Sequence, residues 1–505
     1  MKLSKQNVYK IKEPAVTVPA ASYFDLPEKV LQFGTGVLLR GLPDYFIDKA
    51  NKQGIFNGRI VVVKSTGSGG EDVFDKQDGL YTICVRGIEN DQVIEENIIN
   101  ASISRVLSAK SDWDEILKCA ANGDMQVIIS NTTEVGIVLD KKDNIHLSPP
   151  QSFPGKLLAF LYQRYKVFNG DVTKGMVIIP TELISDNGSV LESIVLELAH
   201  LNGLEIPFID WLENHNHFCS SLVDRIVPGK PAAHSQTAIE SQLEYQDDLL
   251  IIAEVYRLWA IEIADKKIAE ILSFSKIDAG VIIAPDIEMY RELKLRLLNG
   301  AHTFSCGLAF LAGFSTVTQS MEDKNFCAFI TRLMQQEITP AIINKNLSGE
   351  AAKDFSNKVL DRFRNPHINH KWLGITMQYS SKMKMRNLPS ILNYYQQYKT
   401  IPPCMVLGFA AFLLFMNCYK SADGKYYGDY NGIHYLVNDD NAAWFCEKWN
   451  NKDVVKAILG DKEFWGTDLL LLNGFVENVS QSLKLLIEEG PALLLQKSYE
   501  EKIIS

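Results

Sequence analysis

Lys294, Asn299 and His302 are polar residues in a segment whose pattern predicts a helix. At about 100° per residue they fall at roughly 0°, 140° and 80° around the helix, on one broad face. At about 1.5 Å per residue, Lys294 and His302 are roughly 12 Å apart along the axis, and a break at Gly300 would shorten that distance. We therefore expect one helix face to line a cleft, in which a substrate several carbons long bridges the three side chains.

Lys294 is the candidate base of an alcohol–ketone interconversion. Oxidation of a secondary alcohol needs a group that takes the hydroxyl proton while hydride leaves carbon for a nicotinamide. Burial beside a cationic nicotinamide would adapt a lysine to that task, and the protonated amine would return the proton when the ketone is reduced. Taken alone, a helix lysine is more often a solvated surface residue, and His302 could be a core histidine bonded to the main chain.

No residue spacing indicates a catalytic metal. The sequence contains 9 histidines and 8 cysteines, and the closest pair, His215 and His217, has no third ligand nearby in the sequence. We therefore predict a side-chain base rather than a zinc ion.

A nucleotide-binding turn is indicated near the N-terminus. The apolar strand Val30–Phe33 leads into two of the three glycines of a dinucleotide fingerprint, with Leu39 at the third position. Gly34 permits a tight turn, and Gly36 lets a pyrophosphate approach the N–H groups of a helix N-terminus. Such a glycine pair is otherwise an ordinary turn. We predict cofactor contacts from these residues: Phe33, Gly34, Thr35, Gly36, Arg40, Lys64 and Asp78.

The first half of the chain alternates apolar strands with helical segments, and the second half is patterned as helices. Continuous apolar strands predict a parallel sheet covered on both faces, which is a doubly wound, Rossmann-like α/β domain. The candidate strands are Val30–Phe33, Ile60–Val63, Val127–Ser130, Met176–Ile179 and Val281–Ala284. The candidate helices are Lys156–Phe168, Ser189–Leu201, Tyr290–Leu311, Phe326–Glu337, Leu388–Tyr398, Val406–Asn417 and Asp468–Glu489. We expect a loop over 149–154, a dinucleotide-binding domain over 1–285 and a helical substrate-binding and catalytic domain over 286–505.

Composition and charge exclude several classes of protein. With 46% hydrophobic residues, 22% charged residues and a net charge of -10, the chain is typical of a globular protein and not of a nucleic-acid binder. The most apolar run, Cys404–Met416, is shorter than the roughly 20 residues that span a bilayer. The N-terminal segment lacks a signal-peptide pattern, and the cysteines form no CxxC pair, which predicts reduced thiols in the cytoplasm. The oligomeric state is left open.

Several blocks of the sequence resemble the mannitol dehydrogenase family of long-chain polyol and sugar-acid dehydrogenases. The Lys-x4-Asn-x2-His spacing of Lys294, Asn299 and His302 is the most specific of them. Further blocks in family order are Gln77-Asp78-Gly79-Leu80-Tyr81-Thr82, Phe153-Pro154-Gly155-Lys156-Leu157, Asp186-Asn187-Gly188 and Val223-Asp224-Arg225-Ile226. The blocks that look like family members acting on altronate and tagaturonate are Asn131–Glu134, Pro180–Ile184, Phe218–Val227 and Arg362–Pro366.

The resemblance implies zinc-independent hydride transfer with NAD between altronate and tagaturonate, in hexuronate catabolism. It also implies that Asn299 and Asn187 hold the reacting oxygen, and that Val223 and Asp224 line the substrate cleft. NAD is favoured, although Lys64 stands where NAD-binding proteins often carry an acid and could accept the 2′-phosphate of NADP. From the residues alone, Asn187 is also an ordinary Asn-Gly turn, and Asp224 also a structural ion-pair partner of its neighbour.

One departure from the polyol-oxidising members concerns the substrate. They carry an arginine eight residues before a substrate-site lysine, whereas this chain has Gly374 eight residues before Lys382. A sugar acid brings a carboxylate that basic side chains bind, so we predict an anion site from Lys382, Arg386 and His370. A second departure is Arg291 in place of a glutamate, so the proton relay of those enzymes cannot be carried over.

Two other kinds of function stay open on the sequence. A fructuronate reductase or a mannitol-type polyol dehydrogenase would share the Lys/Asn/His block and differ in how it binds the far end of its substrate. A catalytically silent nicotinamide-binding sensor would belong to another class. The intact Lys294, Asn299 and His302 argue against the sensor.

Overall fold

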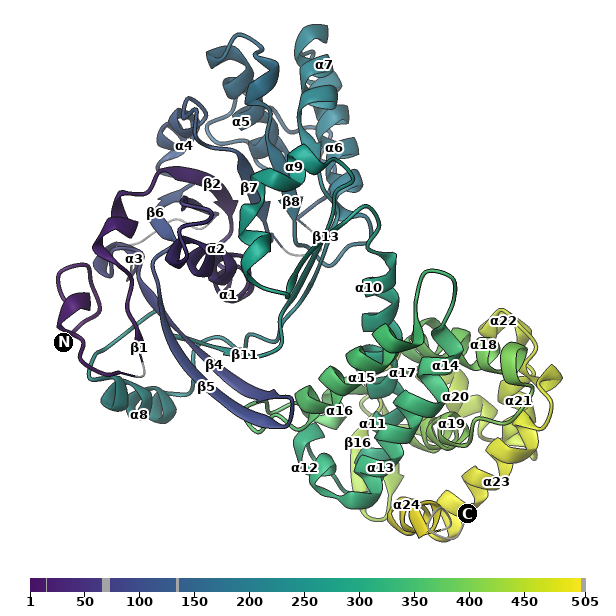
Figure 1. Ribbon diagram of the computed structural model, residues 1–505. Coiled ribbons are helices and arrows are strands. Elements are labelled where there is room, and N and C mark those ends of the chain that lie inside the picture. Colours follow the sequence, from purple (N-terminus) through teal and green to yellow (C-terminus); the bar gives the residue numbers. More distant parts are fainter. Residues whose placement is uncertain (15, 66–72, 133–135, 501–505) are drawn as a thin grey trace. The chain divides into compact units, whose positions relative to one another are not determined.

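The computed structural model describes residues 1–505 apart from residue 15 and the segments 66–72, 133–135 and 501–505. Residues 133 and 134 of the quoted block Asn131–Glu134 therefore lie outside the described chain. The chain divides into two compact units (Figure 1). Unit 1 comprises Met1–Gly87 and Val93–Ile287, and unit 2 comprises Ile88–Gln92 and Glu288–Ser505. The division into a dinucleotide-binding domain over 1–285 and a helical substrate-binding and catalytic domain over 286–505 stays a prediction.

A parallel sheet of six strands forms the centre of unit 1, in the order β6-β3-β2-β7-β8-β9. Its strands are β2 (Glu28–Phe33), β3 (Arg59–Lys64), β6 (Ile103–Ser108), β7 (Val127–Ser130), β8 (Val177–Pro180) and β9 (His217–Phe218). Leu31 of β2 pairs with Val61 of β3 on one side and with Ile128 of β7 on the other. The first four predicted strands are therefore confirmed, and β2 lies inside the sheet with its carboxyl end at the edge where ligands bind in such folds.

Helices cover both faces of this sheet, as the apolar strands predict. Val62 of β3 packs in one core with Phe46 of α2 (Pro43–Lys52), whereas its neighbour Val61 packs in another core with Leu157 and Leu191. The last two residues belong to α5 (Phe153–Val167) and α6 (Asn187–Leu201), so the doubly wound fold is confirmed (Figure 1). The other helical segments of unit 1 are η1 (Val8–Lys10), η2 (Ala21–Asp25), α1 (Val37–Gly41), α3 (Val73–Lys76), α4 (Trp113–Cys119), η3 (Val172–Lys174), α7 (Ile206–His215), α8 (Ala233–Leu243), α9 (Lys266–Ile271) and η4 (Ser273–Ile277).

Two smaller sheets complete unit 1. The first has four strands, in the order β1 (Val16–Thr17), β5 (Gln92–Asn100), β4 (Tyr81–Glu89) and β11 (Ile251–Glu254). The second has three, in the order β10 (Ser221–Asp224), β12 (Leu258–Glu262) and β13 (Val281–Ala284). The strand predicted at 281–284 is present as β13, but its assignment to the central sheet is wrong, because it pairs with β12. The predicted loop is also too long, because the Ser152 hydroxyl accepts from the N–H of Gly155 and starts α5 at Phe153.

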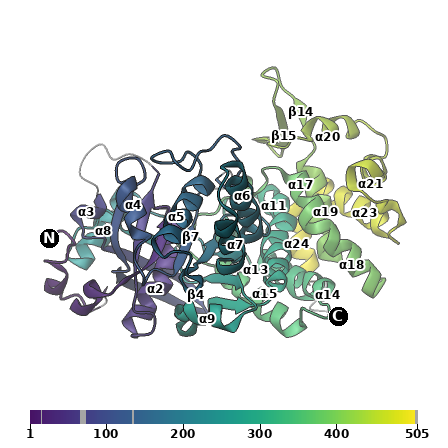
Figure 2. The same cartoon turned by 90° about the horizontal axis from the view of Figure 1, so that it is seen from above.

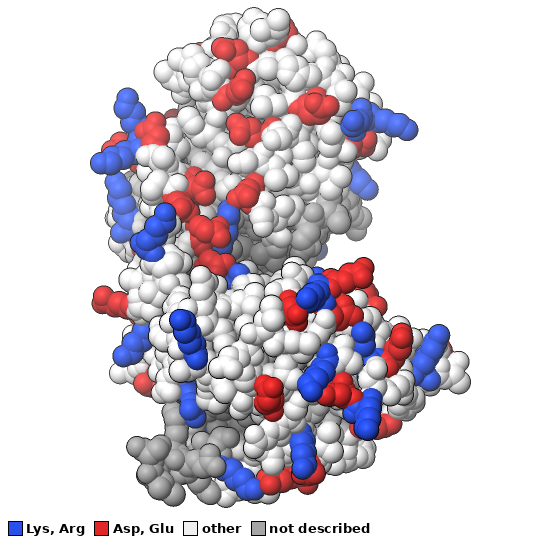
Figure 3. All heavy atoms as spheres, turned by 90° about the vertical axis from the view of Figure 1, so that its right-hand side faces the viewer, with Lys and Arg blue, Asp and Glu red and all other residues white. Residues whose placement is uncertain are grey.

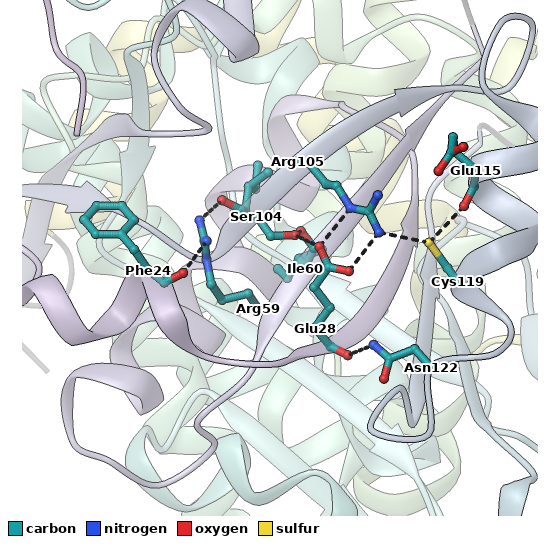
Figure 4. A network of polar contacts seen from close by, with 10 residues as sticks. Phe24, Glu28, Arg59, Ile60, Ser104, Arg105, Glu115, Cys119 and Asn122 are labelled. Atoms are coloured by element: carbon teal, nitrogen blue, oxygen red, sulfur yellow. Dashed lines mark hydrogen bonds and ion pairs between the residues drawn. The ribbon is translucent and has the colours of Figure 1, made fainter. Parts of the chain in front are cut away.

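A polar network ties the amino ends of the central strands together (Figure 4). Glu28, the first residue of β2, accepts two hydrogen bonds from Arg105 of β6, at 2.9 and 3.0 Å. The Ser104 hydroxyl lies 2.8 Å from the same carboxylate and 2.9 Å from the carbonyl of Ile60 in β3, so its single proton is shared between the two acceptors. The main-chain oxygen of Glu28 accepts from Asn122 at 2.9 Å. These bonds fix β2, β3 and β6 at the edge opposite to the one where β2 ends.

Unit 2 is mainly helical, as predicted. Its α-helices are α10 (Glu288–Glu292), α11 (Ala301–Leu311), α12 (Val317–Glu322), α13 (Lys324–Arg332), α14 (Thr339–Ile342), α15 (Gly349–Phe363), α16 (Trp372–Ile375), α17 (Tyr379–Lys382), α18 (Leu388–Tyr398), α19 (Pro403–Phe415), α20 (Ala442–Lys448), α21 (Val454–Leu459), α22 (Lys462–Trp465), α23 (Phe475–Glu488) and α24 (Pro491–Glu500). Three segments are π-helical: η5 (Leu293–Gly300), η6 (Leu333–Ile338) and η7 (Met383–Asn387). The single helix predicted over 468–489 is wrong, because Gly474 has a φ of +72° and separates the 3-10 turn η8 (Leu469–Leu471) from α23.

Two strand-containing segments accompany these helices. The sheet of β14 (Tyr419–Lys420), β15 (Tyr426–Tyr430) and β16 (Ile433–Leu436) lies beside α20 (Figure 2). The turn between β4 and β5, Ile88–Gln92, also belongs to unit 2. There the N–H of Asn90 donates to Asp361 at 3.0 Å, and Asp91 forms an ion pair with Arg364 at 2.9 Å.

Two further features concern the charged side chains of one face and the length of the apolar helices. Lysine and arginine are interspersed with aspartate and glutamate over the face drawn in Figure 3. Among the described residues, no helix is both long enough and apolar enough to cross a membrane. The apolar run predicted as a buried helix is α19, whose residues from Cys404 to Phe415 are all buried.

Candidate functional site

Gly34 and Gly36 form the turn between β2 and α1. Gly34 has a φ of +126°, and a Cβ there would lie 2.9 Å from the Leu39 side chain and 3.0 Å from the carbonyl oxygen of Asn131. Only glycine fits that position without strain. A Cβ at Gly36 would meet no atom within 4 Å among the described residues. The turn is therefore tight at its first glycine and open at its second, as the approach of a pyrophosphate requires.

Phe33 and Arg40, both predicted to contact the cofactor, turn their side chains into the core. Phe33 is 3% exposed, and its ring packs edge-on against Phe153 with centroids 5.2 Å apart. The Arg40 guanidinium donates to the carbonyl of Leu249 at 2.7 Å and lies 5.3 Å from the ring of Tyr81. The Phe33 carbonyl accepts from the N–H of Asn131 at 3.1 Å, and Arg40 holds α1 against the segment before β11, so the contacts of both residues with a cofactor stay a prediction.

Thr35, Lys64 and Asp78 occupy different places in unit 1. Thr35 lies in the turn and Lys64 ends the adjacent strand β3, and both are partly exposed at the carboxyl edge of the sheet. Asp78 precedes Gly79, where a Cβ would lie 2.7 Å from the carbonyl oxygen of Ile103, at the amino end of β6. The structure thus brings Thr35 and Lys64 to the glycine turn but not Asp78, whose cofactor contact stays a prediction.

A buried carboxyl group that the sequence analysis missed lies behind the turn. Asp44 in α2 is fully buried, and burial raises its pKa to about 7, while hydrogen bonds from Gln32 and Tyr81 act in the opposite direction. The hydroxyl of Tyr81 lies 3.2 Å from the Asp44 carboxylate. The amide nitrogen of Gln32 lies 3.5 Å from the Asp44 oxygen that Tyr81 contacts, and 3.4 Å from the carbonyl oxygen of Gly34. The signal in the sequence was Gln32 itself, a polar residue inside a buried strand.

Asn187, predicted to hold the reacting oxygen, is fully buried at the start of α6. Its amide nitrogen lies 3.1, 2.9 and 3.1 Å from the carbonyl oxygens of Pro180, Glu182 and Ser221. Its amide oxygen accepts from the N–H of Ser221 at 2.8 Å. Both ends of this amide are therefore engaged with the main chain of β8 and β10, and its contact with a substrate stays a prediction.

Val223 and Asp224, predicted to line the substrate cleft, are adjacent residues of β10. They are 4% and 6% exposed, and Asp224 is paired in register with Leu258 of β12. The next residue, Arg225, donates to the carbonyls of Gly41 and Glu254 at 2.6 and 2.9 Å. The structure thus places these two residues in unit 1, within a strand anchored to α1 and β11.

Lys294, Asn299 and His302 lie on one uninterrupted helix made of α10, η5 and α11. The helix does not break at Gly300, since this residue has a φ of -66° and a ψ of -45°. Instead, η5 is π-helical, so its hydrogen bonds span five residues rather than four. Because the turn is wider, the angle between Lys294 and Asn299 around the helix axis is smaller than it is in an α-helix. Among the residues that the structure describes, the partly exposed Asn299 amide has no hydrogen-bond partner.

His302 is held by rings rather than by hydrogen bonds. It is 8% exposed, its ring stacks on Phe363 with centroids 4.2 Å apart, and it meets His370 and Trp372 edge-on at 5.1 and 5.8 Å. Its Nε2 is buried without a hydrogen-bond partner in the described chain. Burial lowers the pKa of His302 well below its ordinary value, and four basic neighbours lower it further: His370, Arg362, Arg386 and Lys382. The ring is therefore neutral at pH 7.

The predicted anion-site residues gather around this histidine. Lys382 donates to the carbonyl of Ile375 at 2.9 Å, and Arg386 lies 3.4 Å from the hydroxyl of Thr303, one residue after His302. Burial lowers the pKa of Lys382, Arg386 and His370. Within the described chain, no carboxylate forms an ion pair with any of these three side chains. We call Lys382, Arg386, His370 and the additional Arg362 the basic cluster.

Arg362 is the member of the basic cluster that the sequence analysis did not predict. It lies in α15, is 7% exposed and directly precedes Phe363, on which His302 stacks. The block Arg362–Pro366 was the signal that could have found it. Gly374, which replaces the arginine of the polyol-oxidising relatives, would have open space around a Cβ. In this chain the basic side chains Arg362, Lys382 and Arg386 lie on α15, α17 and η7 of unit 2.

Other features of the described chain lie away from these residues. No three side chains of histidine, cysteine, aspartate or glutamate within the described ranges are grouped to hold a metal ion. All 8 cysteines are free thiols. A cavity between α13 and α19 contains none of the predicted site residues.

Two family models match the chain. The Mannitol dehydrogenase Rossmann domain matches residues 28–272, and the Mannitol dehydrogenase C-terminal domain matches residues 286–487. An altronate oxidoreductase of Bacillus subtilis (strain 168) is 39% identical over 489 residues, which cover 95% of this chain and 96% of that protein. An altronate oxidoreductase of Shigella flexneri is 36% identical over 484 residues, which cover 94% of this chain and 96% of that protein.

Two solved structures share the fold over nearly the whole chain. Mannitol 2-dehydrogenase of Pseudomonas fluorescens, solved as a ternary complex with NAD and D-mannitol, has a TM-score of 0.68 and 23% identity, and the match covers 99% of this chain and 100% of that one. A substrate-free D-sorbitol dehydrogenase has a TM-score of 0.76 and 17% identity, covering 97% and 99%. At such low identity, the likeness concerns the fold alone.

Proposed function

The chain belongs to the mannitol dehydrogenase family, and we propose that it interconverts D-tagaturonate and D-altronate by hydride transfer with NAD(H). One observation carries the proposal: the basic cluster around His302 contains three side chains that have no carboxylate partner in the described chain. A sugar acid supplies that carboxylate, whereas a polyol does not. Relatives at 36% and 39% identity that are named altronate oxidoreductases support the same substrate.

Lys294 is the proton-transferring group of this proposal. In the reductive direction its ammonium gives a proton to the oxygen of the ketone, and in the oxidative direction the amine takes it back. Asn299, whose amide is unengaged in the described chain, donates to the same oxygen as negative charge develops on it. The neutral His302 forms a hydrogen bond through Nε2 to a substrate hydroxyl. This bond gives a partner to a buried nitrogen that has none in the described chain, and a buried polar atom without a partner destabilises the fold.

Arg386 and Lys382 bind the substrate carboxylate in this proposal, with His370 beside them. A guanidinium can hold a carboxylate through two parallel hydrogen bonds, and partial burial strengthens such a pair. Arg386 has only one weak contact, at 3.4 Å, so a substrate would not have to displace a strong partner. Asn187, Val223 and Asp224 remain candidate substrate contacts of unit 1.

The turn at Gly34 and Gly36 fits a dinucleotide, because it is open at the second glycine and lies at the carboxyl edge of the sheet. It would hold the pyrophosphate against main-chain N–H groups, with Thr35 in the turn and Lys64 on the neighbouring strand. When bound, NAD(H) supplies or accepts the hydride. A cytoplasmic location belongs to the proposal, since all 8 cysteines are thiols.

The test is a substrate panel with the purified, chelator-treated protein. NADH and NADPH oxidation are followed with tagaturonate, fructuronate and fructose in parallel. Rapid NADH oxidation with tagaturonate alone is the expected result. A preference for fructuronate or fructose would overturn the substrate assignment but keep the chemistry of Lys294. The absence of turnover with all three, together with tight NADH binding, would favour a silent sensor.

A further inference from the structure

The π-helical turn that carries Lys294 and Asn299 has a partner in a second π-helical segment. Asn387, the last residue of η7, is fully buried, and its amide lies against the end of η5. The amide orientation is assigned from its neighbours, a main-chain N–H on one side and a carbonyl on the other: the amide oxygen then accepts from the N–H of Phe304 at 3.1 Å, and the amide nitrogen donates to the carbonyl of Gly300 at 3.3 Å. These are the two main-chain groups that one α-helical hydrogen bond would join. The side chain thus bonds both groups at the point where η5 passes into α11.

Gly300 permits this close approach. A Cβ at Gly300 would lie 3.2 Å from the Asn387 amide, which is tighter than ordinary contact. Gly300 is therefore the place where a side chain from another helix reaches this one. A side chain that inserts into the hydrogen-bond ladder is a known cause of a local change in helix geometry.

A second set of bonds joins the same two segments. Arg296 of η5 donates to the carbonyls of Met385 and Arg386 at 2.7 and 2.8 Å. Its guanidinium is fixed by Glu292, which it contacts at 3.0 and 3.2 Å. The helix with the proposed base and the segment with a proposed carboxylate ligand are therefore tied together in the middle of η5, at Arg296, and at its end, at Gly300.

We propose that Asn387 is a positioning residue, which holds the wide turn of η5 and thereby sets Lys294 and Asn299 on the face that His302 shares. The inference rests on the proposed function for its effect on turnover. The hold on the helix itself depends only on the contacts of Asn387 with Gly300 and Phe304. Loss of the amide would let η5 rewind towards α-helical geometry, which rotates Lys294 away from Asn299.

The experiment compares Asn387→Asp and Asn387→Ala with wild type and with Asn393→Asp. Asn393 is exposed on α18, the helix that follows η7, so its variant makes the same chemical change away from the helix contact. Asn387→Asp keeps an acceptor for Phe304 but loses the donor to Gly300, and Asn387→Ala loses both. We expect kcat for tagaturonate to fall at least about tenfold in Asn387→Ala and less in Asn387→Asp, with KM within about threefold and a displaced pH profile of kcat.

A readout that needs no substrate separates this inference from the proposed function. Hydrogen exchange of the peptide that covers Gly300–Phe304 should accelerate in Asn387→Ala and stay as in wild type in Asn393→Asp. If wild type turns over none of the sugars, the exchange result still decides whether Asn387 holds the turn. Unchanged exchange, or unchanged kcat in an active enzyme, would overturn the positioning role. A uniform loss of thermal stability with unaltered kcat and pH profile would make Asn387 structural only.

Discussion

His302 stacks on Phe363 with ring centroids 4.2 Å apart and an angle of 20° between the ring planes. The imidazole is therefore oriented by an apolar surface, and neither of its nitrogens is bonded within the described chain. An apolar contact fixes the plane of the ring without using its hydrogen-bonding capacity. The ring can accordingly give that capacity to a ligand.

The surroundings of His302 predict a loss of stability in acid. Burial and basic neighbours lower its pKa well below 6.5, and burial also lowers the pKa of His370. Between pH 6.5 and the lower pKa of the folded protein, the unfolded chain binds more protons than the folded one. The free energy of unfolding therefore decreases as the pH is lowered, by up to about 1.4 kcal/mol per pH unit for each histidine. Thermal melting from pH 7.5 to 5 should show this, and His302→Gln should weaken the slope. An equal slope in both proteins would contradict the assignment.

Lys294→Ala should lower kcat for tagaturonate reduction by about 10² to 10⁴, the range of a lost general acid or base. NADH binding, measured by fluorescence, should change little, because the glycine turn lies on unit 1. Lys353→Ala, at an exposed position of α15, is the matched control. A Lys294→Ala protein with more than a tenth of wild-type turnover would remove Lys294 from the mechanism.

Arg386→Gln should raise the KM for tagaturonate by about 10- to 150-fold, because a charge-assisted hydrogen bond contributes roughly 1.5–3 kcal/mol. Tagatose, which lacks the carboxylate, should be affected much less. Lys384→Gln removes the same charge two residues earlier, at an exposed position, and should leave both substrates unaffected. An equal effect of Arg386→Gln on both sugars would mean that Arg386 shapes the helix and does not bind the carboxylate.

The two glycines of the turn should respond differently to alanine. Gly36→Ala meets no described atom and keeps an ordinary φ of -58°, so the fold should be retained. Its methyl group stands where a pyrophosphate would approach, and the Kd for NADH should rise about tenfold or more, a loss of at least roughly 1.4 kcal/mol. Gly34→Ala, with a φ of +126° and a contact at 2.9 Å, should cost about 1–3 kcal/mol of stability. Titration and denaturant melts distinguish the two, and wild-type NADH affinity in Gly36→Ala would argue against the site.

Asp44 should oppose the histidines in the pH dependence of stability. Its pKa is raised by burial from 3.8 to about 7, so between those values the folded protein binds more protons than the unfolded chain. The contribution of this group is present at low pH and lost as pH rises through about 7, by up to about 1.4 kcal/mol per pH unit. Asp44→Asn should remove this slope and gain stability relative to wild type at pH 8 in denaturant melts. A variant that is equally destabilised at pH 5 and pH 8 would count against a buried neutral carboxyl group.

The sequence predicted the central sheet well, because its strands carry a strong local signal. Val61 and Val62 are both apolar, and the structure explains why, since each faces a different helix layer. The sheet partner of β13 could not be predicted in the same way. Four apolar residues in a row specify an extended, buried segment, but the choice of neighbour depends on where β12 lies in space.

The candidate site was predictable where it lies on one element. Lys294, Asn299 and His302 share a helix, so their spacing alone placed them on one face. The π-helical turn was not predictable, since Asn387 comes from another helix and joins η5 only in the folded chain. Arg362 was missed for the same reason. Nothing in the sequence of α15 alone indicates that His302 of another helix stacks on Phe363, the residue next to Arg362.

The turn Ile88–Gln92 has a consequence for recombination between relatives. It belongs to unit 2 although it lies far from the rest of that unit in sequence, and Asp91 and Arg364 form an ion pair. A chimera with one crossover near Ile287 would therefore join helices from one parent to a hairpin tip from the other. The five residues Ile88–Gln92 therefore need to come from the same parent as the helical part. Chimeras that exchange both together should be tolerated better than chimeras with a single crossover.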